Sequence, residues 1–407
     1  MIKDVFTPAD ILIPDGISME NWSVIACDQF SSEREYWERV RGRVGDTPST
    51  LNMIIPEAYL EETDERESIE SIRAAMDGYM SGGILREAKD SFVYVMRTQP
   101  DGRVRRGLVG TVDLEDYDFS GKKAAILASE GTVLDRLPAR IRIRRAACIE
   151  LPHIISFIDD RDATVIEPLS KLVGELPVLY DFTLMEGGGN VKGMRVTGKN
   201  AEAIMHAMRV LHKKNDILMV IGDGNHSLAS AKVYWDELKL GLSAAERDTH
   251  PSRRALLEVN NVYDDAISFE AIHRVVFDIE PTEFVSAFKD VIPRGADYEL
   301  QWVSGGKSGT IGVKAGCIGD MLTSMQTFLD EYVNQTGCRV DYIHGADSVE
   351  RLAGEERCLG LILPAMDKSE LFATVAARGV FPKKSFSVGH ARDKRYYLEC
   401  RSIKMEN

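Results

Sequence analysis

The stretch VIGDGNHSLASAK, residues 220–232, predicts a strand that turns directly into a helix. The apolar residues 217–221 lead into the turn and are typical of a buried strand. Gly222 and Gly224 permit positive φ angles and a close approach of the backbone to a ligand. A turn of this kind is a common anion site in α/β folds, and it is also a common ordinary link between a strand and a helix.

The side chains of this turn decide what chemistry it can do. Asp223 supplies an acid and His226 a titratable base at one point of the chain. Asn225 or Ser227 is predicted to cap the helix, whose first amide groups would face outward from the strand end. The candidate catalytic residues are Asp223 and His226, and the candidate phosphate-binding residues are Gly222, Gly224, Asn225 and Ser227. The alternative is an ordinary Asp-Gly turn with a histidine that bonds to the backbone.

Helical and strand patterns alternate along the rest of the chain. Around the turn, the periodicity predicts helices over 199–212 and 227–240 on either side of a strand over 216–221. Hairpins are predicted over 91–114, 178–197 and 299–316, and strands over 254–263 and 395–403. Further helices are predicted over 33–43, 67–80, 281–292, 320–334 and 367–377. Hairpins mixed with strand-helix units indicate a mixed α/β (α+β) fold.

Length and composition limit the class of protein. A chain of 407 residues favours two domains, and we place them at 1–270, which carries the turn, and 271–407, packed against it. A net charge of -14 argues against a nucleic-acid or membrane partner, since both require a basic face. The six cysteines show no paired spacing, which fits reduced thiols. The start of the chain lacks a signal-peptide pattern, and no apolar run approaches about 18 residues. We therefore expect a cytoplasmic protein.

A second candidate site lies in ASEGTVLDRLPARIRIRR, residues 128–145. With Pro138 near a helix start, Arg136, Arg140 and Arg144 would share one helix face. Arginine suits phosphate or carboxylate ligands because its guanidinium donates two hydrogen bonds at once. The alternative is a solvated basic face paired with surface acids. Glu130 adds a carboxylate to the same segment.

Two shorter segments also combine polar groups with a strand. In WSVIACDQFSSEREYW, residues 22–37, an apolar run ends at Asp28, which is either a catalytic carboxylate or a helix-entry residue. Cys27 is a small core residue or, alternatively, a reactive thiol. In residues 272–277, His273 and Arg274 stand just before a predicted strand, as an exposed pair or as phosphate ligands.

Two glycine-rich segments resemble phosphate-binding loops, but the residues around them do not match those motifs. Residues 187–189 lie between two strand patterns and predict a hairpin turn. Residues 306–308 resemble the end of a Walker A motif, but Gln301 stands where the motif requires glycine and a strand follows. We expect neither segment to bind phosphate.

Taken together and in order, these segments resemble the domain-of-unknown-function family 1015, whose core is similar to the ParB/sulfiredoxin superfamily. The resemblance covers nearly the whole chain. It rests on VIACDQFSSEREYW, PSTLNMIIPE, GLVGTVDLEDY, EGTVLDRLPARIRIR, HPSRRALLEVNNVYDDAISFEAIHRVVF and GVFPKKSFSVGHARDKRYYLECR. The central family motif is an Asp-Gly-His-His-Arg-like turn that opens a helix. Here it reads Asp223-Gly224-Asn225-His226-Ser227, so the first histidine and the arginine are absent.

The superfamily resemblance implies a nucleotide phosphate at the turn. Its members include free-serine kinases that use a nucleotide, ATP-dependent sulfiredoxins and CTP-binding ParB proteins. It implies a phosphoryl-transfer enzyme that acts on a small hydroxy amino acid or its phosphate ester, with ATP or ADP and Mg²⁺. Because Ser227 replaces the family arginine, the positive charge would come from Arg140, Arg144 or Arg274. The expected hydroxyl base is Asp28 or Glu130, with Asp223 as the other choice.

Two other functions remain open on the sequence. One is a nucleotide-binding regulator of ParB-like type without catalysis, which the absent arginine at 227 favours. The other is sulfiredoxin-like thiol repair through Cys27. The expected partner is a small phosphorylated molecule, and a homodimer is the expected assembly. No metal ligand set is assigned, and the role of residues 281–345 stays open.

Overall fold

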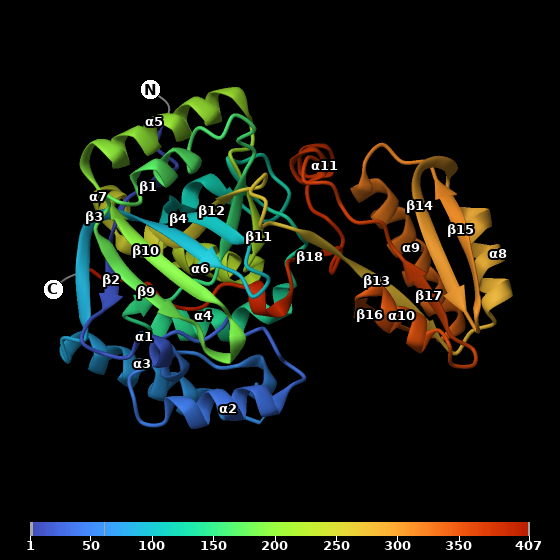
Figure 1. Cartoon of the computed structure of the whole chain (residues 1–407), viewed down its shortest axis with the longest axis horizontal. Helices are drawn as coiled ribbons and strands as arrows, with labels where there is room; N and C mark the ends of the chain where they lie inside the picture. The colour runs from blue at the N-terminus through green and yellow to red at the C-terminus, as the bar shows by residue number, and fades with distance from the viewer. Residues whose placement is uncertain (1–2, 61, 406–407) are drawn as a thin grey trace. The chain divides into compact units, whose positions relative to one another are not determined.

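The computed structural model describes residues 3–60 and 62–405 and divides into two compact units (Figure 1). The first unit comprises residues 1–128, 132–267 and 390–407, and the second comprises 129–131 and 268–389. The predicted border after residue 270 lies close to the observed one. The prediction that all of 271–407 belongs to the second unit is not met, because the final segment returns to the first unit. There β19 (Arg401–Ser402) pairs with β7 (Ile149–Glu150).

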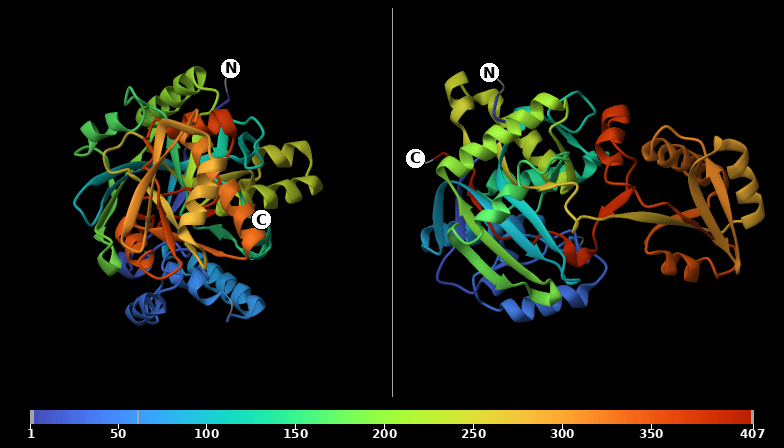
Figure 2. Two further views of the ribbon diagram at one scale, coloured as in Figure 1. Left: turned by 90° about the vertical axis from the view of Figure 1, so that its right-hand side faces the viewer. Right: turned by 45° about the horizontal axis from the view of Figure 1, so that its top comes forward.

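A large mixed sheet forms the centre of the first unit (Figure 2). Strand β11 (Met219–Asp223) is one of its inner strands. β11 runs parallel to β6 and antiparallel to β8, so both of its edges are paired. Met219, Val220 and Ile221 are fully buried, which explains the apolar run before the turn. The strand order is β5 (Tyr117–Asp118), β6 (Ile126–Ala128), β11, β8 (Ile155–Ile158), β12 (Arg254–Asn261), β4 (Val104–Asp113), β3 (Leu85–Thr98), β10 (Asn190–Val196) and β9 (Val178–Thr183), with β1 (Phe6–Thr7) on β4 and β2 (Ala9–Pro14) on β3.

The helices of the first unit include those predicted on either side of β11. α5 (Gly198–Lys214) precedes the strand and α6 (Asn225–Leu238) follows it, and Leu228, Ala231 and Trp235 of α6 are buried. In Figure 1, α5 lies at the opposite end of this unit from α2 (Arg34–Val44) and α3 (Glu65–Ser81). The remaining helices are α1 (Met19–Trp22), α4 (Leu137–Ala146) and α7 (Ala244–Thr249). Single 3-10 turns are η1 (Thr50–Met53), η2 (Glu57–Tyr59), η3 (Leu114–Asp116), η4 (Leu134–Arg136), η5 (Glu167–Leu172), η6 (Met185–Gly187), η7 (Lys239–Gly241), η8 (Pro251–Arg253) and η9 (Ala391–Asp393).

The second unit has its own sheet and its own aromatic core. The sheet order is β15 (Lys307–Val313), β14 (Arg294–Ser304), β17 (Leu359–Ile362), β13 (Phe269–Phe277) and β16 (Arg339–His344), with β18 (Phe386–Val388) also on β13. Phe284 and Phe288 of α8 (Pro281–Val291) pack against Phe328 of α9 (Ile318–Thr336). The other helices are α10 (Ala346–Leu352) and α11 (Glu370–Arg378). The mixed α/β class predicted from the sequence is confirmed.

Both glycine-rich segments that resemble phosphate loops are hairpin turns. Residues 187–189 connect β9 to β10, and Gly187 and Gly189 have φ angles of 72° and 84°. Gly306, with φ of 77°, lies in the turn between β14 and β15. Their glycines therefore supply the left-handed conformation that tight turns need.

One predicted strand, 395–403, is mostly wrong. Only Arg401–Ser402 forms a ladder, while Tyr396 and Cys400 make single bridges to Ile25 and Leu12. This extended segment instead runs through the interior of the unit. Every residue from Asp393 to Arg401 is buried. Within the described ranges, none of the helices combines the length and the apolar character that a membrane crossing requires.

Candidate functional site

The turn after β11 has the conformation that its glycines predict. Gly224 has a φ of 79°, and α6 begins at the next residue. A Cβ on Gly224 would lie 3.0 Å from Ile154 Cα, and a Cβ on Gly222 would lie 2.1 Å from a ring carbon of Phe157. Both positions therefore require glycine. The prediction that Asn225 or Ser227 caps α6 is wrong, because Gly224 occupies the N-cap and both residues lie inside the helix.

Asp223 and His226 have specific partners at this turn. Asp223 Oδ1 accepts a hydrogen bond from its neighbour Gly224 N at 3.0 Å, and Oδ2 lies 3.3 Å from Lys394 Nζ. His226 Nε2 accepts a hydrogen bond from Val133 N at 3.1 Å. The proton of a neutral ring must then lie on Nδ1. His226 therefore ties the segment that precedes α4 to the first turn of α6.

Helix α4 brings the predicted arginines next to α6, against which it packs. Arg140 pairs with Glu57, and Arg144 Nη2 lies 2.7 Å from Glu150 Oε2. Both guanidinium groups are mostly buried, with 27% and 14% of the side chain exposed. The two more exposed arginines of the helix, Arg142 and Arg145, pair with surface acids. The side chain of Arg136 lies outside the described residues.

A cavity of about 190 Å³ joins α4 to α6. Ser227 lies in the first turn of α6, and it lines the cavity together with Arg140 and Arg144. Cys27, His153 and Tyr397 line the same space from other parts of the first unit. The first turn of an α-helix leaves amide groups without intrahelical acceptors, and Ser227 is the residue of this turn that lines the cavity beside the arginines.

Tyr397 connects two of the cavity residues. Its hydroxyl oxygen lies 2.9 Å from His153 Nδ1 and 3.2 Å from Cys27 Sγ. Burial, and then the charge of Asp28, raise the pKa of the Cys27 thiol to about 12. The thiol is therefore protonated at neutral pH, which disfavours it as a nucleophile.

Asp28 belongs to a charged group that includes the cavity residue His153. Burial alone would raise its pKa, but the charge of His153, a 3.0 Å hydrogen bond from Gln29 Nε2 and the charge of Lys394 outweigh burial and lower it. Lys394 also contacts Asp223, so it lies between the two predicted acids. We call Asp28, His153, Asp223 and Lys394 the acid–base cluster. The Asp28 carboxylate is therefore ionised at neutral pH, and Lys394 supplies positive charge to both acids of the cluster.

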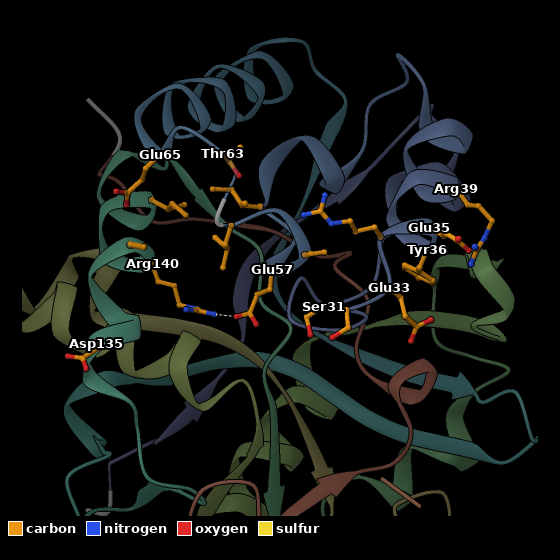
Figure 3. Close-up of a pocket in the computed structure, with 17 residues that line it drawn as sticks. Ser31, Glu33, Glu35, Tyr36, Arg39, Glu57, Thr63, Glu65, Asp135 and Arg140 are labelled. Atoms are coloured by element: carbon orange, nitrogen blue, oxygen red, sulfur yellow. Dashed lines mark hydrogen bonds and ion pairs between the residues drawn. The ribbon is translucent and has the colours of Figure 1, made fainter. Parts of the chain in front are cut away.

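A larger cleft of about 1080 Å³ opens on the other side of the Glu57–Arg140 pair. Figure 3 shows Arg140 extending from its helix toward Glu57, with Ser31 and Glu33 on the far side. Glu57 and Arg140 line both this cleft and the smaller cavity. The pair therefore stands at the boundary between the two spaces, where a ligand could contact both.

Three predicted site residues belong to the second unit and have structural partners there. Glu130 Oε1 accepts a hydrogen bond from Ser385 N at 3.3 Å. His273 Nδ1 accepts one from Leu363 N at 3.1 Å. Arg274 is fully buried over the ring of Tyr342, 4.5 Å from its centroid. The expectation that His273 and Arg274 precede a strand is wrong, because both lie within β13.

No metal centre is built into the part of the chain that the structure describes. Within residues 3–60 and 62–405, no group of three histidine, cysteine or acidic side chains is placed to hold an ion. Lys394 already compensates Asp223 and Asp28. The cluster would therefore offer at most one or two carboxylates to Mg²⁺, which usually keeps water and phosphate oxygens as its other ligands.

A family model described as a protein of unknown function, DUF1015, matches residues 13–389. The chain belongs to this family. The match includes the turn after β11, helix α4 and Asp28, whereas Lys394 and Tyr397 lie beyond its end. Among curated proteins, none matches the chain.

Several solved structures are similar to the chain at low identity. A free serine kinase in complex with AMP is 14% identical, with a TM-score of 0.39, and the match covers 72% of this chain and 90% of that one. A variant free serine kinase in complex with ADP is 12% identical, with a TM-score of 0.40 over 74% and 93% of the two chains. SbnI with a C-terminal truncation, from Staphylococcus aureus, is 10% identical, with a TM-score of 0.37 over 69% and 82%.

The sequence analysis missed three residues that the structure places at the site: His153, Lys394 and Tyr397. His153 precedes the short strand β8, and the other two lie in the segment that returns from the second unit. A lysine and a tyrosine in an alternating segment carry no local sign of a site. The available signal was the unusual density of polar residues, DKRYYLECR, in a segment that overlaps a predicted strand.

Proposed function

We propose that the chain is a phosphoryl-transfer enzyme that acts on a small hydroxylated molecule or its phosphate ester, with ATP or ADP as the nucleotide. One observation carries the proposal. Ser227, in the first turn of α6, lines the same cavity as Arg140 and Arg144 of α4. Amide donors and guanidinium groups that converge on one space are the arrangement that phosphate groups bind.

The transfer itself would depend on positioning and charge more than on covalent chemistry. In the proposal, the first turn of α6 and the arginines hold the phosphate groups. Arg140 would exchange Glu57 for a phosphate oxygen, since both side chains border the open cleft. This exchange replaces one anionic partner of Arg140 by another, and it releases the carboxylate of Glu57 at the edge of the open cleft.

The acid–base cluster supplies the other groups that the reaction needs. Asp28 is ionised and would orient the acceptor hydroxyl and receive its proton. Its lowered pKa makes it a weak base, which suits a transition state in which the hydroxyl proton leaves late. Lys394 would offset negative charge near Asp223 as phosphate oxygens approach. A nucleotide would bring Mg²⁺ with its phosphates, and Asp28 and Asp223 are the carboxylates available to it.

A second function has one observation in its favour. Arg140 and Arg144 each already have a carboxylate partner, Glu57 and Glu150. Guanidinium groups that are neutralised in this way favour a nucleotide-binding regulator of ParB-like type over an enzyme. Sulfiredoxin-like thiol repair is disfavoured, because burial raises the pKa of the Cys27 thiol to about 12.

The experiment that separates these functions measures turnover and binding on the same preparation. The protein is incubated with ATP or ADP, Mg²⁺ and a panel of hydroxy amino acids that includes serine, and the reverse reaction is run from the phosphate esters. Product that appears with wild type and is lost with Asp28→Asn supports the enzyme. Thermal stabilisation by nucleotide without product supports the regulator. If the nucleotide does not stabilise the protein and no product forms, both functions are refuted.

A further inference from the structure

A small internal cavity lies in the first unit, next to the segment that returns from the second unit. Its volume is about 20 Å³. Five charged side chains line it, and each exposes 4% or less of its surface. They are Arg97, Arg105, Arg395, Glu258 and Glu399. Charged groups are rarely buried so completely unless each has a partner.

Arg395 uses both carboxylates of this group. Its Nε lies 2.9 Å from Glu258 Oε2, and its Nη2 lies 2.5 Å from Glu399 Oε2. Burial would lower the pKa of Arg395, but the charges of Glu399 and Glu258 outweigh it and raise the pKa. The hydroxyl of Tyr180 also donates to Glu399. Glu258 and Glu399 therefore already have charged or hydrogen-bonding partners other than Arg97 and Arg105.

Arg97 and Arg105 keep donors that no described residue accepts. Arg97 Nη2 donates to Arg392 O at 3.0 Å and Arg105 Nη1 donates to Asp393 O at 2.7 Å. Arg97 Nη1 and Arg105 Nε are buried and have no hydrogen-bond partner among the described residues. Arg105 Nε lies 3.5 Å from Glu258 Oε1, which is a charge contact without hydrogen-bond geometry. Burial, and then the charge of Arg105, lower the pKa of Arg97 to about 10.

The charges around the cavity do not balance. Arg97, Arg105 and Arg395 carry three positive charges, and Glu258 and Glu399 carry two negative ones. Asp393 does not line the cavity, but its charge acts on Arg97, and its carboxylate accepts a hydrogen bond from His390 N at 2.9 Å. Among the side chains that line the cavity, positive charges therefore outnumber negative ones by one, and buried charge is costly unless counter-charge lies close to it.

We propose that this cavity binds a single small monovalent anion of the chloride class, held between Arg97 Nη1 and Arg105 Nε. The volume selects the ligand, because about 10–15 Å³ suffices for one water-sized sphere and larger oxyanions such as phosphate or sulfate do not fit. The inference is independent of the proposed function, since none of these arginines belongs to the cavity between α4 and α6. The anion would stabilise the sheet against the returning segment 394–399.

The test in solution uses the full chain and sodium salts at matched ionic strength. Thermal unfolding is followed in chloride, in bromide and in gluconate, which is too large for the site. Chloride and bromide should raise the unfolding midpoint relative to gluconate, by roughly 2–4 °C for each tenfold increase near saturation. Identical midpoints in all three salts would overturn the proposal.

A variant and a crystal complete the test. Arg97→Met should lose the difference between chloride and gluconate, whereas the exposed helix variant Arg66→Met should keep it. If Arg97→Met does not fold, the unfolding midpoints of wild type in chloride, bromide and gluconate still test the proposal. Crystals of wild type grown in bromide should show an anomalous peak between Arg97 and Arg105. Bromide found only at exposed positions, with water in the cavity, would contradict the proposal.

Discussion

The ammonium group of Lys394 lies 3.3 Å from the carboxylate of Asp223, and its charge also lowers the pKa of Asp28. One cation thus joins two acids that come from distant parts of the sequence. Its side chain is only 8% exposed, so water screens the interaction weakly. The predicted acids therefore lie in one electrostatic environment, which local sequence patterns could not reveal.

Replacing Lys394 should affect catalysis more than folding. In the proposed reaction, Lys394→Met should reduce phosphoryl transfer by about 10²–10³-fold, the usual effect of removing one preorganised charge. Lys394→Arg, which keeps the charge, should retain more activity. The matched control is Lys122→Met, at an exposed position, which should behave as wild type. Equal activity of Lys394→Met and wild type, with both folded by circular dichroism, would remove Lys394 from the mechanism.

The stability of the protein in acid should depend on Asp28. Its pKa is lower in the folded chain than the ordinary value of 3.8. The contribution of this carboxylate to stability is therefore fully present above about pH 4 and is lost as the pH falls through the folded pKa. The difference in free energy of unfolding between wild type and Asp28→Asn should shrink from pH 5 toward pH 2.

Urea unfolding at several pH values measures this difference. The exposed residue Asp265 provides the control, and Asp265→Asn should follow wild type at every pH. A gap between wild type and Asp28→Asn that stays constant or widens on acidification would show that the pKa of Asp28 is not lowered by folding.

Cys27 should be chemically inert in the folded protein. Burial raises the pKa of its thiol to about 12, so the reactive thiolate is scarce at pH 8. Iodoacetamide should label Cys27 only after denaturation, as measured by mass spectrometry of the peptide. Cys27→Ser should keep full phosphoryl-transfer activity. Rapid labelling of the native thiol, or a loss of activity in the serine variant, would support a catalytic role for the Cys27 thiol.

Gly224 should be required by both fold and ligand binding. Its φ of 79° strains any other residue, and a Cβ would lie 3.0 Å from Ile154 Cα. Gly224→Ala should cost about 1–3 kcal/mol of stability and weaken nucleotide binding. Gly241→Ala is the control, because that glycine has open space around it and no positive φ. Equal melting temperatures for the two variants would contradict this account of the turn.

Local sequence patterns predicted a helix, strand or turn well where the neighbouring residues alone determine its conformation. The apolar run and paired glycines before α6 gave the strand, the turn and the helix, because burial and positive φ act on the residues themselves. The capping prediction failed because Asn225 and Ser227 suit an N-cap by type, while the left-handed Gly224 begins the helix instead.

The candidate site could be predicted only in part, because its members come from separate segments. The spacing of the arginines placed Arg140 and Arg144 on one helix, and both line the cavity. No local rule shows that His273 and Arg274 lie within a strand of the other unit. His153 and Tyr397 are far apart in sequence, and the fold brings His153 Nδ1 to 2.9 Å from the hydroxyl oxygen of Tyr397. Such contacts follow from topology, which a single sequence does not specify.

The central claim is that the cavity between α4 and α6 binds phosphate groups. Titration calorimetry with ADP tests it most directly, with wild type, Arg140→Met and Arg142→Met. Arg142 is the matched control, since it lies on the same helix, is half exposed and pairs with Glu65 outside the cavity. The account predicts that Arg140→Met weakens ADP binding by about tenfold to a hundredfold and that Arg142→Met leaves it unchanged. Equal affinities for all three proteins, or no binding by wild type, would contradict it.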